Sequence, residues 1–161
     1  MTYVLSYMRE VTEAMRILIE KAARRLTLLD DNSQKISVFP IALGSCPVGP
    51  KEKEGDGKTP EGQYFVCLKK LGKYGPSLGV SYPNEQDAIH MNASEELVAC
   101  IRDRAARGER PPWGSALGGE IYIHGGGAAS DWTAGCIALN DADARTLYNA
   151  VALGTEIEIV E

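Results

Sequence analysis

Long loops rich in glycine and proline interrupt this chain from residue 40 onward, and these loops constrain the fold more than any other feature. The chain has 17 glycines and 8 prolines in 161 residues. Residues 44–62 alone hold five glycines, three prolines and seven charged residues. Such residues favour turns and long loops, and loops of that length are usually functional or mobile. Strands are expected to outnumber helices in the rest of the chain, so the fold is expected to be mainly β.

The apolar pattern of the segments predicts short strands with a few helices. Strands are expected at 16–20, 24–29, 35–43, 63–71, 120–124 and 155–160, and residues 24–43 read as a hairpin. Helices are expected at 2–14, 94–108 and 141–153, and the last of them ends at a glycine. Residues 72–84 are expected to form a second Gly/Pro-rich connection. The prediction is a mainly β (α+β) fold with two or three peripheral helices.

The length and charge narrow the class of protein. We expect residues 15–161 to form one domain and residues 1–14 to be an N-terminal extension or short helix. The net charge is −5, and the 17 basic residues are scattered among 22 acids, which argues against nucleic-acid binding. The cluster Lys21, Arg24 and Arg25 is interpreted as a solvated face. No apolar run is long enough for a membrane span, and no signal peptide is visible.

Cysteine and histidine are few and are not spaced for a metal. The four cysteines include no CxxC pair, and there are two histidines, so no structural zinc is expected. Free thiols are the default, and no chemistry is assigned to Cys46, Cys67 or Cys100. His90 is expected at the surface, in a lid region.

Residues 121–141 carry the chemistry-bearing pattern. A strand leads to His124 and a glycine run, and Cys136 follows twelve residues later, after Gly135. A nucleophilic cysteine needs a base and backbone N–H groups for the developing oxyanion. The carbonyl of Gly125 could orient the imidazole. The alternative is that Cys136 is a buried apolar residue and His124 a strand-end residue satisfied by backbone. An α/β-hydrolase oxyanion motif at 124–127 fits neither the length nor the pattern.

Several ordered motifs resemble the YkuD-type L,D-transpeptidases over roughly residues 15–160. The catalytic signature is matched by His124-Gly125 followed by Asp131-Trp132-Thr133-Ala134-Gly135-Cys136-Ile137-Ala138, as in the branch reading D-W-T-x-G-C-I-A. The stretches 55–64, 77–84 and 39–44 match the loop with T-P-x-G, a further segment of that branch, and the opening strands.

The resemblance implies a compact β-sandwich and a cysteine-dependent enzyme. Cys136 would be the nucleophile, His124 its base, the Gly125 carbonyl its orienting group, and the N–H groups of Gly135 and Cys136 the oxyanion hole. The family attacks L,D-peptide bonds of peptidoglycan stem peptides through a thioester, which an amine or water resolves. The resemblance implies no metal or organic cofactor. It also implies an extracytoplasmic location and a role in cell-wall biogenesis or cell shape.

Departures from the common S-H-G-C-[IV]-R pattern leave alternatives open. Thr133 replaces serine, Ala134 histidine and Ala138 arginine, so a cation near the site is lost. The protein could instead be a catalytically silent peptidoglycan-binding module of the same fold, or a cytoplasmic cysteine amidase. Candidate substrate-binding residues are Thr133, Asp131 and Trp132. Asp131 could contact a substrate amine, and the alternative is that it caps a turn. Cross-linking and hydrolysis, and the oligomeric state, stay open.

Overall fold

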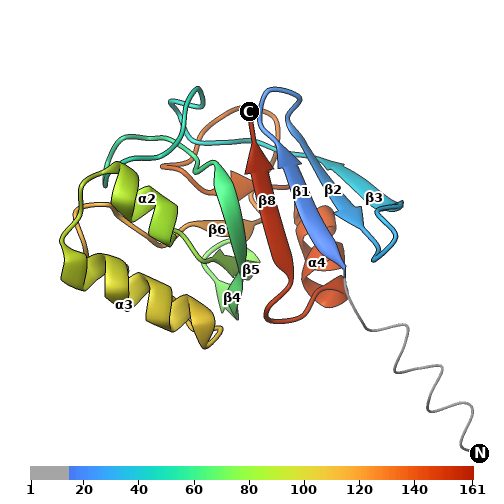
Figure 1. Cartoon of the computed structure of the whole chain (residues 1–161). Helices are drawn as coiled ribbons and strands as arrows, with labels where there is room; N and C mark the ends of the chain where they lie inside the picture. Colours follow the sequence, from blue (N-terminus) through green and yellow to red (C-terminus); the bar gives the residue numbers. More distant parts are fainter. Residues whose placement is uncertain (1–14) are drawn as a thin grey trace, which may run out of the picture.

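The computed structural model describes residues 15–161; the short helix and extension predicted for residues 1–14 lie outside this range. The described chain contains eight strands and three helices (Figure 1). The strands are β1 (Arg16–Glu20), β2 (Arg25–Leu29), β3 (Lys35–Pro40), β4 (Gly62–Gly72), β5 (Gly75–Val80), β6 (Tyr122–His124), β7 (Ile137–Ala138) and β8 (Glu156–Val160). The helices are α2 (Glu85–His90), α3 (Glu95–Ala106) and α4 (Asp141–Ala150).

The strands form one curled sheet in the order β3-β2-β1-β8-β4-β5-β6-β7. Most neighbours are antiparallel, but β1 pairs with β8 and β6 pairs with β7 in parallel. Ala42, just after β3, exchanges backbone hydrogen bonds of 2.8 and 2.9 Å with Ala138 of β7. This bridge brings the chain leaving one edge strand to the other edge, so the sheet bends almost into closure around its core. The predicted mainly β fold is confirmed.

The core follows from the alternation of the central strands. In β1 and β8 every second residue is buried, which places Ile17, Ile19, Ile157 and Ile159 inside the sheet. Helix α4 packs on β5 and β6, whereas α2 and α3 pack against each other beside β4 (Figure 1).

The predicted hairpin and the helix of residues 94–108 are confirmed, the helix with Ser94 Oγ accepting the Leu97 N–H at 3.1 Å. Prediction of 72–84 as a connection is wrong, because β5 runs from Gly75 to Val80. Its glycines and proline mimic a loop, yet Val80 and Leu78 are buried in the sheet. The short helix α2, capped by a reciprocal pair of hydrogen bonds between Asn84 and Asp87, was not predicted.

The last helix ends earlier than predicted. It stops at Ala150, because Val151 is extended, and Gly154 instead forms the turn before β8. The Lys69 ammonium donates to the carbonyls of Tyr148 and Val151, each at 2.7 Å, and so satisfies acceptors at the helix end.

The interpretation of the basic cluster as a solvated face is wrong for Lys21. Lys21 is only 1% exposed, and its ammonium donates to the carbonyls of Gly49 and Thr59 at 2.8 Å and contacts Glu61 at 3.3 Å. Burial lowers the pKa of Lys21, and these oxygens offset that cost. Lys21 is therefore an internal tether, whereas the part-exposed Arg24 and Arg25 form ion pairs with Asp131 and Glu20. Among residues 15–161 no helix is both long and apolar enough to cross a membrane.

Candidate active site

Strands β6 and β7 place Cys136 and His124 on one face of the sheet. Ile123 is paired with Ile137 and His124 with Ala138. Continuing the register by one residue sets Cys136 beside Tyr122, whose N–H donates to Cys136 Sγ at 3.4 Å. Side chains two residues apart on a strand share a face, and adjacent strands lie about 4.8 Å apart. The thiol and the imidazole are thus diagonal neighbours.

The imidazole of His124 is held in one orientation by its own neighbour. His124 is 5% exposed, and its Nδ1 lies 2.6 Å from the Gly125 carbonyl oxygen. Because a carbonyl only accepts, Nδ1 carries the proton and Nε2 keeps its lone pair. Burial lowers the pKa of His124, which this hydrogen bond partly offsets. His124 is therefore a neutral imidazole near neutral pH, suited to accept a proton.

The thiol of Cys136 is only half-buried and is held in its protonated form. Burial raises its pKa, while the Tyr122 N–H and the positive charge of Lys51 act in the opposite direction. Its Sγ also lies 3.5 Å from the Glu120 carbonyl, to which the thiol donates. In residues 15–161 no hydrogen bond joins Sγ to the imidazole, as is common in enzymes without substrate. The resting pair is neutral thiol and neutral imidazole.

The loop before Cys136 is organised by Thr133. Its hydroxyl donates to the Cys136 carbonyl at 2.7 Å and accepts the Gly135 N–H at 3.1 Å. Gly135 has φ +144°, and a Cβ there would lie 2.7 Å from the Lys58 carbonyl oxygen, so only glycine fits. Within the described residues the N–H groups of Ala134 and Cys136 have no acceptor. The amide of Gly135, predicted as an oxyanion donor, is occupied by Thr133.

The threonine of the T-P-x-G motif braces this loop from the other side. Thr59 is buried, and its hydroxyl accepts the Gly44 N–H at 3.1 Å and donates to the Gly135 carbonyl at 2.9 Å. One side chain thus ties the end of the opening hairpin to the residue that precedes the candidate nucleophile.

The long Gly/Pro-rich loop is ordered around one carboxylate. Asp56 accepts from the Lys51 ammonium and the Glu52 N–H, each at 2.8 Å, and from the Lys53 and Lys58 N–H groups at 3.1 Å. These bonds outweigh burial and lower the pKa of Asp56 to about 2. The loop therefore forms a fixed wall that also carries the charge of Lys51 toward the site.

Asp131 is engaged by the protein itself. Arg24 donates to its carboxylate from Nε at 3.1 and 3.2 Å and from Nη2 at 2.8 Å, and the Leu43 N–H donates at 2.9 Å. These partners lower its pKa. A charge-assisted, two-pronged pair of this kind fixes geometry well. The carboxylate thus anchors the D-W-T segment to the β1–β2 turn, a role that neither sequence interpretation included.

Two aromatic side chains flank the imidazole. The Tyr74 ring stacks on His124 with centroids 4.7 Å apart, and Trp132 meets both edge-on at 5.1 and 5.8 Å. Trp132 is 38% exposed and donates its indole N–H to the Gly127 carbonyl at 3.0 Å. Tyr74 was missed from the sequence, because the β4–β5 turn gives no signal that its tip reaches β6.

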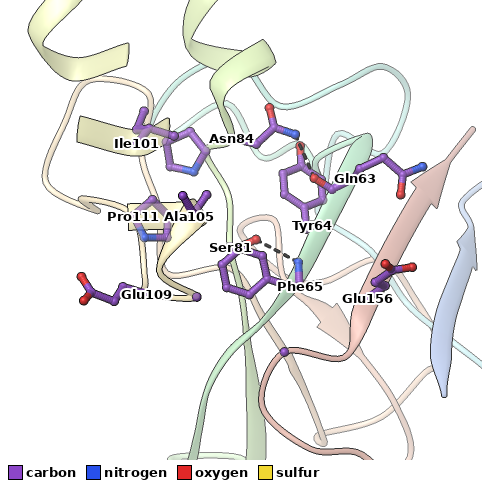
Figure 2. Close-up of a pocket in the computed structure, with 14 residues that line it drawn as sticks. Gln63, Tyr64, Phe65, Ser81, Asn84, Ile101, Ala105, Glu109, Pro111 and Glu156 are labelled. Carbon is purple, nitrogen blue, oxygen red and sulfur yellow. Dashed lines mark hydrogen bonds between the residues drawn. The ribbon is translucent and has the colours of Figure 1, made fainter. Parts of the chain in front are cut away.

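A cavity of about 590 Å³ lies away from these residues (Figure 2). It sits between β4 and α3, and Tyr64, Phe65, Ile101 and Ala105 are among its lining residues. None of the sequence-predicted site residues lines it. Catalysis requires converging polar groups rather than volume alone, so we place the candidate site at Cys136.

The other candidate groups stand apart from chemistry. The chain does contain one G-x-S-x-G pentapeptide, at 75–79, but its Ser77 is buried inside β5 with its hydroxyl on the Gly75 carbonyl at 3.0 Å, not on a strand-to-helix elbow. Burial raises the pKa of Cys67 to about 11. His90 is exposed, as predicted, in α2. Among the described residues no three His, Cys, Asp or Glu side chains group as metal ligands.

The family model of the YkuD L,D-transpeptidase catalytic domain matches residues 14–159. The chain therefore belongs to the L,D-transpeptidase catalytic domain family. Among curated proteins, the candidate L,D-transpeptidase YafK of Escherichia coli K12 is 34% identical over 80 residues, covering 46% of this chain and 32% of YafK. The chain thus spans about a third of that relative's length.

Solved structures share the fold. The helical cell shape determining protein Pgp2 of Campylobacter jejuni (K307A mutant) has TM-score 0.68 at 24% identity, covering 92% of this chain and 47% of Pgp2. Bd1075 of Bdellovibrio bacteriovorus has TM-score 0.62 at 22% identity, covering 94% and 49%. L,D-transpeptidase 1 of Mycobacterium tuberculosis has TM-score 0.53 at 17% identity, covering 92% and 62%. The TM-scores show that these three proteins share the fold of this chain.

Proposed function

We propose that this protein is a cysteine-dependent acyltransferase or peptidase acting on L,D-peptide bonds of peptidoglycan stem peptides. The observation that carries the proposal is the strand register that sets Cys136 and His124 on one face as diagonal neighbours, with His124 Nδ1 fixed by the Gly125 carbonyl. Membership of the L,D-transpeptidase family supplies the substrate class. Action on peptidoglycan implies an extracytoplasmic location.

The first step transfers an acyl group to sulfur. The Cys136 thiol gives its proton to His124 Nε2 as the sulfur attacks the substrate carbonyl carbon. The N–H of Cys136, with that of Ala134, donates to the resulting oxyanion, while Thr133 keeps the Gly135 N–H. The C–N bond then breaks, the leaving amine takes the proton from Nε2, and a thioester remains on Cys136.

The second step releases the acyl group. An amine or water loses a proton to Nε2 and attacks the thioester carbonyl, and the thiol leaves with that proton. An amine acceptor gives a cross-link, and water gives cleavage. The neutral resting pair requires that proton transfer accompany attack, because burial disfavours a preformed thiolate–imidazolium pair.

Turnover of a tetrapeptide stem and of cross-linked muropeptides tests the proposal. The products are separated by chromatography and identified by mass spectrometry. Wild-type protein is expected to convert at least one of them, and Cys136→Ala neither. Cys46→Ala is the matched control, because Cys46 is an exposed thiol elsewhere. A silent binding module would bind the stem without turnover, and equal rates for wild type and Cys136→Ala would refute the proposal.

A further inference from the structure

The catalytic face of the sheet extends beyond the two catalytic strands to β4. Gly79 of β5 is paired both with Tyr122 of β6 and with Leu68 of β4. Two residues further along β4, Lys70 is paired with Ser77. Paired residues share a face and alternate residues return to it, so Lys70 lies on the same face as Tyr122, His124 and Cys136.

Lys70 is held directly above the strand that contacts the nucleophile. Its Nζ lies 4.6 Å from the centroid of the Tyr122 ring, and the N–H of the same tyrosine donates to Cys136 Sγ at 3.4 Å. Between them β5 contributes Gly79, where a Cβ would lie 2.7 Å from Leu68 Cγ. Because Gly79 has no side chain, the Lys70 side chain can reach across β5 to the Tyr122 ring.

Within the described range 15–161, no acidic side chain pairs with Lys70. Lys21 and Lys51 are buried and paired with Glu61 and Asp56. In contrast, Lys70 is exposed and takes part in no ion pair or side-chain hydrogen bond among residues 15–161. A cation near an aromatic ring keeps its charge and its remaining donors for a ligand.

The same face lacks the cation that the common family pattern places two residues after the cysteine. Ala138 occupies that position, on the catalytic face beside His124, and it is fully buried. A second unpaired lysine, Lys73, lies 5.4 Å from the Tyr74 ring that stacks on His124. The β4–β5 hairpin therefore supplies two cations beside the aromatic residues of this face, whereas Ala138 of β7 supplies none.

We propose that Lys70 binds the carboxylate next to the scissile bond of the acyl-donor stem peptide and so replaces the missing arginine. This rests on the proposed function for its substrate class. The ammonium approaches the carboxylate from the Tyr122 side while the scissile carbonyl lies at Cys136. Lys70 is thus a substrate-binding residue that acts on affinity, and it takes no part in proton transfer.

Binding of a stem tetrapeptide to Cys136→Ala protein, measured by calorimetry, tests this without turnover. Adding Lys70→Met, which keeps an aliphatic side chain over Tyr122, is expected to weaken affinity about five- to tenfold. Lys70→Arg is expected to weaken it less than about twofold. Lys35→Met, at an exposed lysine of β3, is the control and should leave affinity unchanged. Far-UV circular dichroism and melting confirm that each variant is folded.

A second peptide identifies the group that Lys70 contacts. In this peptide the carboxylate next to the scissile bond is amidated. Cys136→Ala protein that keeps Lys70 should bind the amidated peptide about as weakly as the Lys70→Met variant binds the unmodified peptide. The Lys70→Met variant should bind the amidated and the unmodified peptide equally. Unchanged affinity of Lys70→Met for the acid, an equal loss on both peptides, or no binding of either peptide would overturn the inference. Turnover that is equal in wild type and Cys136→Ala would instead overturn the proposed function.

Discussion

The candidate catalytic face and the cavity beside α3 differ in the way they are held. At the face, Thr59, Thr133 and Asp131 bind backbone groups on either side of Cys136 within 3.1 Å. At the cavity, the polar contacts shown in Figure 2 are Ser81 with the Phe65 N–H at 2.9 Å and Asn84 with the Gln63 carbonyl at 3.0 Å. Catalysis requires preorganised polar groups, so the braced loop before Cys136 is the better candidate for a reactive site than the cavity.

The largest expected effect comes from removing the base. His124→Ala should lower kcat about a thousandfold, because general base catalysis by a positioned side chain contributes typically 10²–10⁴-fold. His90→Ala is the control, since that imidazole is exposed in α2, and its kcat should match wild type. Steady-state assay of stem-peptide turnover measures both. Activity of His124→Ala close to that of wild type would remove His124 from the mechanism.

A smaller loss is expected from the brace at Thr59. Thr59→Val removes the bonds to the Gly44 N–H and Gly135 carbonyl, and leaving buried groups unpaired costs roughly 1–3 kcal/mol each. We expect a lower melting temperature and a kcat about tenfold lower, as the nucleophile loop loosens.

Ser81→Ala provides the cavity-side comparison for Thr59→Val. It also removes a buried hydroxyl that bonds a backbone N–H, so it should lower stability while leaving kcat unchanged. Equal loss of kcat in both variants would show that the effect is global destabilisation and not positioning of Cys136.

The pH dependence should reflect a neutral His124. Because burial lowers its pKa below 6.5, the base is fully active above that pKa and is lost as pH falls through it. The acid limb of kcat/KM is therefore expected below pH 6.5, with activity maintained through neutrality. An acid limb above pH 7 would contradict the assigned neutral pair.

The smallest effect is expected at the cavity. Ala105→Leu adds an apolar side chain to a lining position on the exposed surface of α3, and such surface changes are usually within about 0.5 kcal/mol. Both the melting temperature and stem-peptide kcat should stay near wild type. A clear fall in kcat without loss of stability would mean that the cavity takes part in turnover.

Much of the fold could be predicted from the chain because its alternation is local. The hairpin and the helix capped by Ser94 depend on residues close in sequence. Strand β5 was missed because Gly75, Pro76 and Gly79 resemble a loop, and only pairing with β4 and β6 shows them to be a strand. The burial of Lys21 likewise depends on acceptors 28 to 40 residues away.

The site was predictable only in part. The motif around His124 and Cys136 marks the candidate catalytic pair, but the roles of Asp131 and Thr133 depend on partners that spacing does not show. Arg24 lies 107 residues from Asp131, and Tyr74 and Lys70 reach the site only because β4, β5 and β6 are neighbours in the sheet. Long-range register was the information that the sequence pattern lacked.

The most direct test of Cys136 as nucleophile is the intact mass of the protein after brief mixing with a tetrapeptide stem and acid quenching. The account predicts an added mass equal to the acyl fragment after loss of the leaving group. Peptide mapping should place this mass on Cys136, and Cys136→Ala should lack it. Product formation with no adduct on Cys136, or an adduct that persists in Cys136→Ala, would contradict it.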